Sequence, residues 1–197
     1  MTSIPTATSQ TVLCALLLAM GIATGAEDPR NVPDATPPPL GTASFVPPSN
    51  VDQQPLTPQT FVVQAALINM TEIETGGLTQ TRSGSAAVKE FGSRLVKDHR
   101  AALAKLKTIA AEGKISLPGE LDPEHQGLRD ELAGLEGPAF DEKFVAAMAS
   151  GHNKALTLFK TAADSDKLTP ALRNYASATL PTLQQHAQMA HQLQASR

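Results

Sequence analysis

The stretch SAAVKEFGSRLVKDHRAALAKLKTIAAE, residues 85–112, predicts one long amphipathic helix. Its apolar side chains recur at the helical period on a single face, which consists of Val88, Phe91, Leu95, Ala102, Leu103 and Leu106. His99 lies near the centre of that face, where a leucine would pack better. Gly113 follows at a position where helices commonly end. The stretch therefore predicts a helical protein with a histidine that faces its core.

Three other segments predict long helices of similar length. Residues 59–82 are apolar on most sides, so we expect a largely buried helix. The third long helix starts at Gly137 and Pro138. The fourth starts at Thr169 and Pro170, a capping residue followed by a proline, and ends near residue 194.

Two smaller features complete the helical pattern. Asp122 and Pro123 begin a short extra helix within the segment that links the second long helix to the third. Pro181 lies inside the fourth long helix, where we expect a kink. We therefore predict an all-α, antiparallel four-helix bundle over residues 59–195.

The first 58 residues predict export. Residues 12–23, VLCALLLAMGIA, are an apolar run too short to span a bilayer comfortably, and small residues precede a plausible cleavage site after Ala26. Residues 1–26 are thus expected to be a signal peptide. An uncleaved anchor is the alternative, because the first ten residues contain no lysine or arginine. Residues 27–58 contain nine prolines and predict a disordered tether.

Composition excludes several classes of function. The net charge is −3, so nothing favours binding to nucleic acid. Cleavage after Ala26 would remove the only cysteine, Cys14, and thereby exclude thiolate chemistry. It would also remove the apolar run, so we expect no integral membrane domain in the mature protein. No serine–histidine–aspartate arrangement or phosphate-binding glycine loop is recognisable. The sequence predicts a periplasmic or outer-membrane-associated protein, whose partners, whether envelope proteins or further copies of the chain, it does not specify.

Three of the five histidines are expected to face the core at one level. Helical projection places His99, His152 and His186 inward, one from each of three helices. Glu72 on the first helix is the carboxylate expected beside them, although periodicity does not separate it from Glu74. Counting residues from the turns places Glu72 and the three histidines within about 12 Å along the bundle axis.

These residues also carry a resemblance to a known family. The strings VKEFGSRLVKDH, GPAFDEKFVAAMASGH and LRNYASATLPTLQQHAQMAHQL resemble an exported bacterial family known only as domain of unknown function 4142. The resemblance covers about residues 59–194 and implies a ferritin-like bundle and export, but no settled activity. It places eight residues of this chain at positions of the family pattern, namely Asp98, His99, Phe140, Asp141, His152, Leu180, Pro181 and His186. Glu72 matches the glutamate of its first helix.

Two interpretations of the histidines remain open. Three imidazoles and the Glu72 carboxylate suit one divalent ion such as zinc, copper, nickel or iron, with Asp98 and Asp141 as weaker candidate ligands. A ferritin-type di-iron centre is disfavoured, because no glutamate stands three residues before any of the three histidines. Alternatively, the histidines form a buried polar network or a pH-sensitive element in a non-catalytic structural or stress-associated envelope protein. No reaction is specified by the sequence.

Overall fold

In the computed structural model of this chain, residues 54–196 are described. The signal peptide expected over residues 1–26 and most of the tether expected over residues 27–58 lie outside them. Just before Gln59, Leu56 packs against the core and Thr57 caps the first helix. The folded segment thus starts a few residues before Gln59, where a helix was expected to begin.

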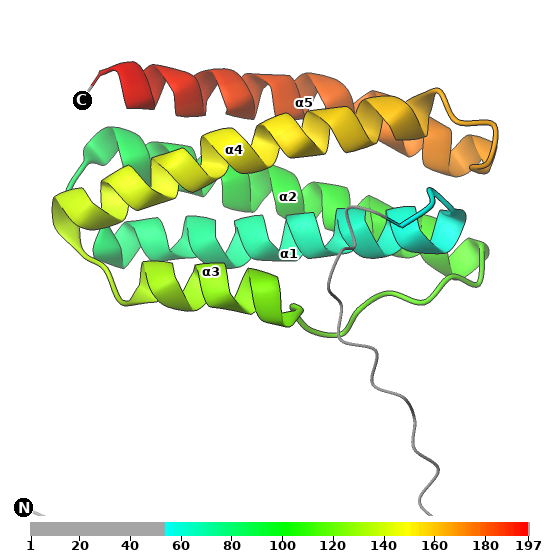
Figure 1. Cartoon of the computed structure of the whole chain (residues 1–197), viewed down its shortest axis with the longest axis horizontal. Coiled ribbons are helices and arrows are strands. Elements are labelled where there is room, and N and C mark those ends of the chain that lie inside the picture. Colours follow the sequence, from blue (N-terminus) through cyan, green and yellow to red (C-terminus); the bar gives the residue numbers. More distant parts are fainter. Residues whose placement is uncertain (1–53, 197) are drawn as a thin grey trace, which may run out of the picture. The chain divides into compact units, whose positions relative to one another are not determined.

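The first two helices form an antiparallel hairpin. Helix α1 (Pro58–Arg82) begins at a capping box, in which Thr57 and Thr60 each accept a hydrogen bond from the other's backbone. Helix α2 (Ala86–Glu112) is capped by Ser85 and ends at Gly113. Only residues 83–85 separate the two helices, so they must pack side by side in opposite directions (Figure 1).

The second hairpin consists of α4 (Gly137–Ala163) and α5 (Pro170–Ala195). Thr169 caps α5 by accepting a hydrogen bond from the backbone of Leu172. Helix α5 remains one helix through Pro181. Pro181 and Ser177, whose carbonyl loses its helical donor there, are both exposed, so water can satisfy that carbonyl.

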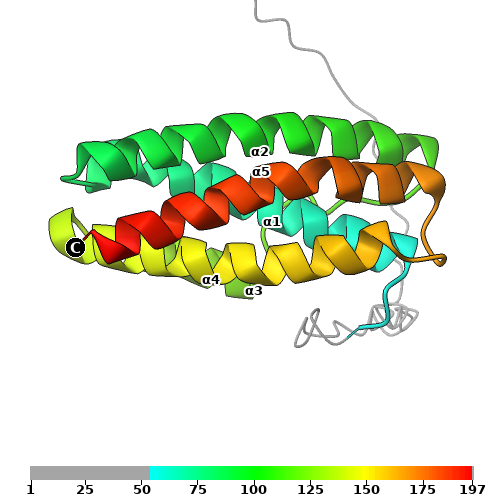
Figure 2. The ribbon, with the colours of Figure 1, turned by 90° about the horizontal axis from the view of Figure 1, so that it is seen from above.

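A long connection joins the two hairpins. Helix α2 ends at the opposite end of the bundle from the start of α4, and the chain between them carries α3 (Pro123–Ala133) along α1 (Figure 1). Helix α1 packs on α2 and α4. Helix α5 also packs on α2 and α4, and it lies between α2 and α4 in the view of Figure 2. Neighbouring long helices run antiparallel. The predicted four-helix bundle with a short extra helix is confirmed.

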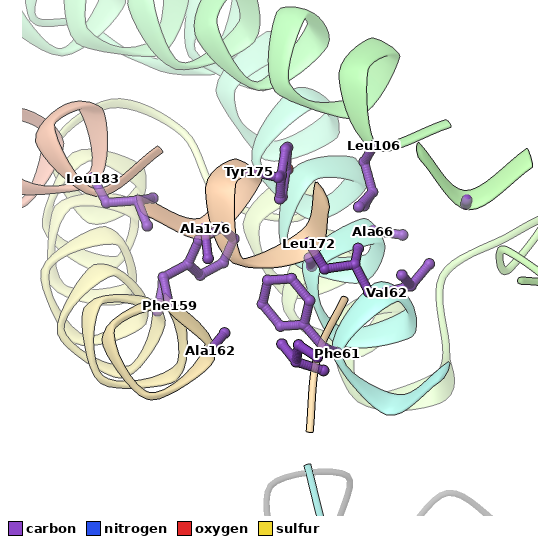
Figure 3. Close-up of a cluster of buried hydrophobic side chains, with 14 residues drawn as sticks. Phe61, Val62, Ala66, Leu106, Phe159, Ala162, Leu172, Tyr175, Ala176 and Leu183 are labelled. Carbon is purple, nitrogen blue, oxygen red and sulfur yellow. The ribbon is translucent and has the colours of Figure 1, made fainter. Parts of the chain in front are cut away.

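The apolar core of the bundle is divided into two clusters. One lies near the α4–α5 turn and includes Phe61, Phe159 and Tyr175 (Figure 3). The other contains Phe91 and Phe144 together with further side chains of α2, α4 and α5. Along each of these three helices a buried polar residue stands between the members of the two clusters, which places a polar layer across the middle of the bundle.

A pair of glycines brings α1 and α2 unusually close. A Cβ atom at Gly92 would lie 2.1 Å from Oγ1 of Thr79 and 2.7 Å from the backbone oxygen of Gly76. A Cβ atom at Gly76 would in turn lie 3.0 Å from the backbone oxygen of Gly92. Only glycine fits at Gly92 without a shift of α1, and this contact fixes the distance between the helices just beyond the polar layer.

Candidate metal centre

Three histidines meet in the polar layer. His99 on α2, His152 on α4 and His186 on α5 are at most 3 % exposed. One nitrogen from each ring lies within 4.8 Å of the other two. Helical periodicity brings each side chain inward, and the two hairpins hold them at the same height. The structure thus brings together the three histidines that the sequence predicted to share a site.

The side chain of Asn69 on α1 orients His99. Its amide nitrogen donates to the backbone oxygen of Ala65 at 2.6 Å and to the hydroxyl of Tyr175 at 3.2 Å. Its oxygen is therefore an acceptor, and it lies 3.0 Å from Nδ1 of His99. In neutral His99 the proton must be on Nδ1, which leaves the lone pair of Nε2 available.

The other two histidines are oriented in the same way by different acceptors. Nδ1 of His152 lies 2.9 Å from the backbone oxygen of Met148. Nε2 of His186 lies 3.0 Å from Oδ2 of Asp98. Both acceptors require a proton on the nitrogen that they contact. The free lone pairs are therefore on Nε2 of His152 and Nδ1 of His186.

The nitrogens with free lone pairs are buried and unsatisfied. No described residue offers a hydrogen-bond partner to Nε2 of His99, Nε2 of His152 or Nδ1 of His186. Metal-binding histidines typically donate the proton of one ring nitrogen to a carboxylate or carbonyl and use the other nitrogen as the ligand. All three rings follow that pattern.

Glu72 on α1 stands beside this cluster. It is 6 % exposed, and its Oε1 lies 3.7 Å from Nδ1 of His152, which is the side of that ring turned toward Met148. No described residue provides a hydrogen bond to its Oε2. Burial raises the pKa of Glu72, and the neighbouring His152 opposes that rise. The carboxylate lies beside the Nδ1 edge of His152, and it is not one of the groups that meet within 4.8 Å.

The surroundings keep two of the imidazoles neutral. Burial, followed by repulsion from His152 and His186, holds the pKa of His99 well below its ordinary value of 6.5. Burial lowers the pKa of His186 to about 4, although Asp98 favours its protonated form. Burial also acts to raise the pKa of Asp98, but hydrogen bonds from Arg94 and His186 outweigh it and the pKa is lowered. An ionised Asp98 facing neutral imidazoles is the state that suits a cation.

The remaining candidates serve other contacts. Asp98 orients His186, and its carboxylate is not among the groups that meet within 4.8 Å. Asp141 accepts a hydrogen bond from the hydroxyl of Ser83 and so ties the α1–α2 turn to the N-terminal part of α4. It precedes His152 by eleven residues on α4, about 16 Å along the axis, and is not brought to the cluster.

Helical periodicity alone did not find Asn69, because α1 is apolar on most sides. Its position three residues before Glu72 was the available signal.

The described residues define a class of structure: a ferritin-like helical bundle with a cluster of three buried histidines contributed by both hairpins. The chain belongs to the family described as domain of unknown function (DUF4142), which matches residues 46–193. No curated protein matches the sequence. Among solved structures, the chain is similar to a crystal structure of a DUF305 fragment from Deinococcus radiodurans. The TM-score is 0.63 and the identity 15 %, over 73 % of this chain and 100 % of that one. That likeness supports the fold.

Proposed function

We propose that the bundle binds one divalent metal ion through His99, His152 and His186. Two observations carry this proposal. The three rings offer nitrogens within 4.8 Å of one another, and each ring has one buried nitrogen without a described partner while its other nitrogen faces an acceptor. A cation satisfies all three lone pairs at once, and it relieves the energetic penalty of burying unpaired polar atoms.

A metal-free polar network satisfies this arrangement less well. A water molecule has two protons, so a single water donates to only two of three acceptors. A proton on His186 would add a buried charge that His152 and Arg94 repel, and a proton on His99 would be repelled by the other two histidines. The lowered pKa values of His99 and His186 reflect this cost. The network remains the second interpretation, and the experiment below separates the two.

The donor set suits zinc, copper(II), nickel or iron(II), all of which accept imidazole nitrogen. Two nitrogens bound to one tetrahedral zinc ion lie about 3.3 Å apart. The three histidine nitrogens lie within 4.8 Å of one another, so each pair must move closer by up to about 1.5 Å when the ion binds. Three protein nitrogens leave a coordination position open, which Glu72 can fill by turning its side chain. The same position could support Lewis-acid chemistry.

We propose further that the protein acts in the cell envelope. The apolar run at residues 12–23, the small residues before position 27 and the proline-rich segment that follows support export. Within the described part of the chain, none of the helices has the length and apolar character to cross a membrane.

Metal titration of the full chain tests the proposed centre. Protein stripped with a chelator is titrated with zinc(II), copper(II) and cobalt(II) by isothermal calorimetry, and the ligand-field absorbance of bound cobalt reports its coordination. We expect one ion per chain and a cobalt spectrum typical of four coordination. His152→Gln should weaken binding strongly, whereas His191→Gln, which changes an exposed histidine on α5, should not.

Two results would decide against the metal centre. Absence of near-stoichiometric binding of any of the three ions by the parent chain would exclude it. Equal affinities for the parent chain and His152→Gln would place the ion elsewhere. In either case, a large loss of stability in His152→Gln would identify the histidine layer as a structural polar network.

A further inference from the structure

A cavity of about 930 Å³ reaches from the surface to the edge of the histidine layer. It is lined by residues of α1, α3 and α4, three elements that contact one another in the bundle (Figure 1). Exposed side chains such as those of Glu124 and Lys154 line its outer part, so it opens to solvent. Its volume falls within the range of small-ligand sites.

Glu72 forms the inner end of this cavity. The residue lines the cavity and is also the carboxylate that stands 3.7 Å from His152. It is 94 % buried, and no described residue supplies a hydrogen bond to its Oε2. A buried carboxylate without such a partner is energetically unfavourable unless a cation or a proton occupies the space beside it. Glu72 thus lies between the cavity and His152, one of the three histidines.

Gly151 leaves the carboxylate accessible from the cavity. It lines the cavity next to His152 on α4, and a Cβ atom built on it would meet only Oε1 of Glu72, at 3.9 Å. Glycine is disfavoured in the interior of a helix, yet α4 has one at this position. Any side chain longer than that of alanine would occupy the space through which the carboxylate faces the cavity.

The charges of the cavity lining favour a cation. Glu72, Asp122 and Glu124 contribute three carboxylates, against the single ammonium group of Lys154. His125 also lines the cavity, and its Nδ1 lies 2.6 Å from Oδ1 of Asp122. Carboxylates at the opening raise the local concentration of cations, and a carboxylate at the inner end can replace part of an ion's water shell.

We propose that this cavity is the entry route for the divalent ion, and that Glu72 takes the ion from the cavity and passes it to the histidines. The inference rests on the proposed metal centre, but it concerns the route and not the final ligands. A route affects the rates of binding and release by the same factor and leaves the dissociation constant unchanged.

The test is the kinetics of uptake by the metal-free full chain, followed by stopped flow with cobalt(II) absorbance. Gly151→Leu should lower the association and dissociation rate constants by tenfold or more while the dissociation constant changes less than threefold. Gly77→Leu is the matched control: it places the same side chain within α1 at an exposed glycine that has no neighbour within 4 Å, and its rates should equal those of the parent.

A second pair of variants tests the charge at the opening. Glu124→Lys should lower the association rate several-fold at low salt and reduce its dependence on ionic strength. Glu112→Lys, which changes an exposed glutamate at the end of α2, should not. Circular dichroism melts confirm that each variant is folded before its rates are compared.

The outcomes separate this inference from the proposed function. If the parent chain binds no ion at equilibrium, the metal centre fails and the route fails with it. If the parent chain binds an ion and Gly151→Leu binds it at the parental rates, the route alone is refuted. The route is also refuted if Gly151→Leu changes the dissociation constant but keeps the parental association rate constant. The substitution would then act on the bound state and not on the passage of the ion.

Discussion

Acid should destabilise the metal-free bundle, because its buried histidines resist protonation. The pKa of His186 is lowered from 6.5 to about 4, and that of His99 lies well below 6.5. In the unfolded chain both rings are exposed and titrate near 6.5. Between pH 6.5 and pH 4 the unfolded state therefore binds protons that the folded state does not, and the free energy of unfolding falls as the pH falls.

The magnitude follows from the same values. For His186, the interval from 6.5 to about 4 corresponds to about 3 kcal/mol lost by pH 4. Domains are typically stable by about 5–15 kcal/mol, so this is a substantial fraction. His99 adds in the same direction, although the rings repel one another and their contributions do not sum independently. The raised pKa of Glu72 acts in the opposite direction, since its folded carboxyl gains a proton first as the pH falls, and it offsets part of the loss.

Urea denaturation followed by circular dichroism measures this effect. Metal-free protein is unfolded at a series of pH values from about 7.5 to about 4.5, and the free energy of unfolding is plotted against pH. The slope should be clearly positive for the parent chain and for His191→Gln, and shallower for His186→Gln. A flat profile for the parent, or an unchanged slope in His186→Gln, would refute the claim that the neutral state of this buried ring limits stability in acid.

Two further predictions concern helix packing and the support of the metal ligands. Gly92→Ala should lower the free energy of unfolding by about 1–3 kcal/mol in denaturant titrations, because the new methyl group collides with Thr79. Gly77→Ala, at an exposed helical site with open space, should raise it by about 0.5–1 kcal/mol, and an equal loss in both variants would contradict this account of the close helix contact. Asp98→Asn should weaken metal binding about 10–100-fold in calorimetric titration, because it removes the charged acceptor that orients His186. Unchanged affinity would mean that this contact does not support the ligand.

The sequence could predict the fold and the position of the histidines for physical reasons. The helical period determines which side of a helix faces the core, and short turns fix the heights of residues on adjacent helices. His99, His152 and His186 were therefore placed correctly, and the bundle and its family are confirmed.

Other features depend on side-chain contacts that periodicity does not encode. Asn69 lies on a helix without a polar face, and only its contact with His99 shows that it determines which ring nitrogen is free. Asp98 was a candidate ligand, whereas the structure uses it to orient His186. The cavity beside Gly151 arises because α3 packs along α1, an arrangement set by the tertiary structure and not by the pattern of α3 itself.

The division of the ligands between the hairpins has a consequence for folding. His99 belongs to the α1–α2 hairpin, whereas His152 and His186 belong to the α4–α5 hairpin. An ion held by all three would close a loop across the 53 positions that separate His99 from His152, and so would act as a reversible cross-link between the two halves of the chain. Each hairpin consists of two helices that follow one another in the chain, but neither supplies all three ligands. Tight metal binding would therefore report that the two hairpins have docked, and release of the ion would weaken their association before it weakens either hairpin.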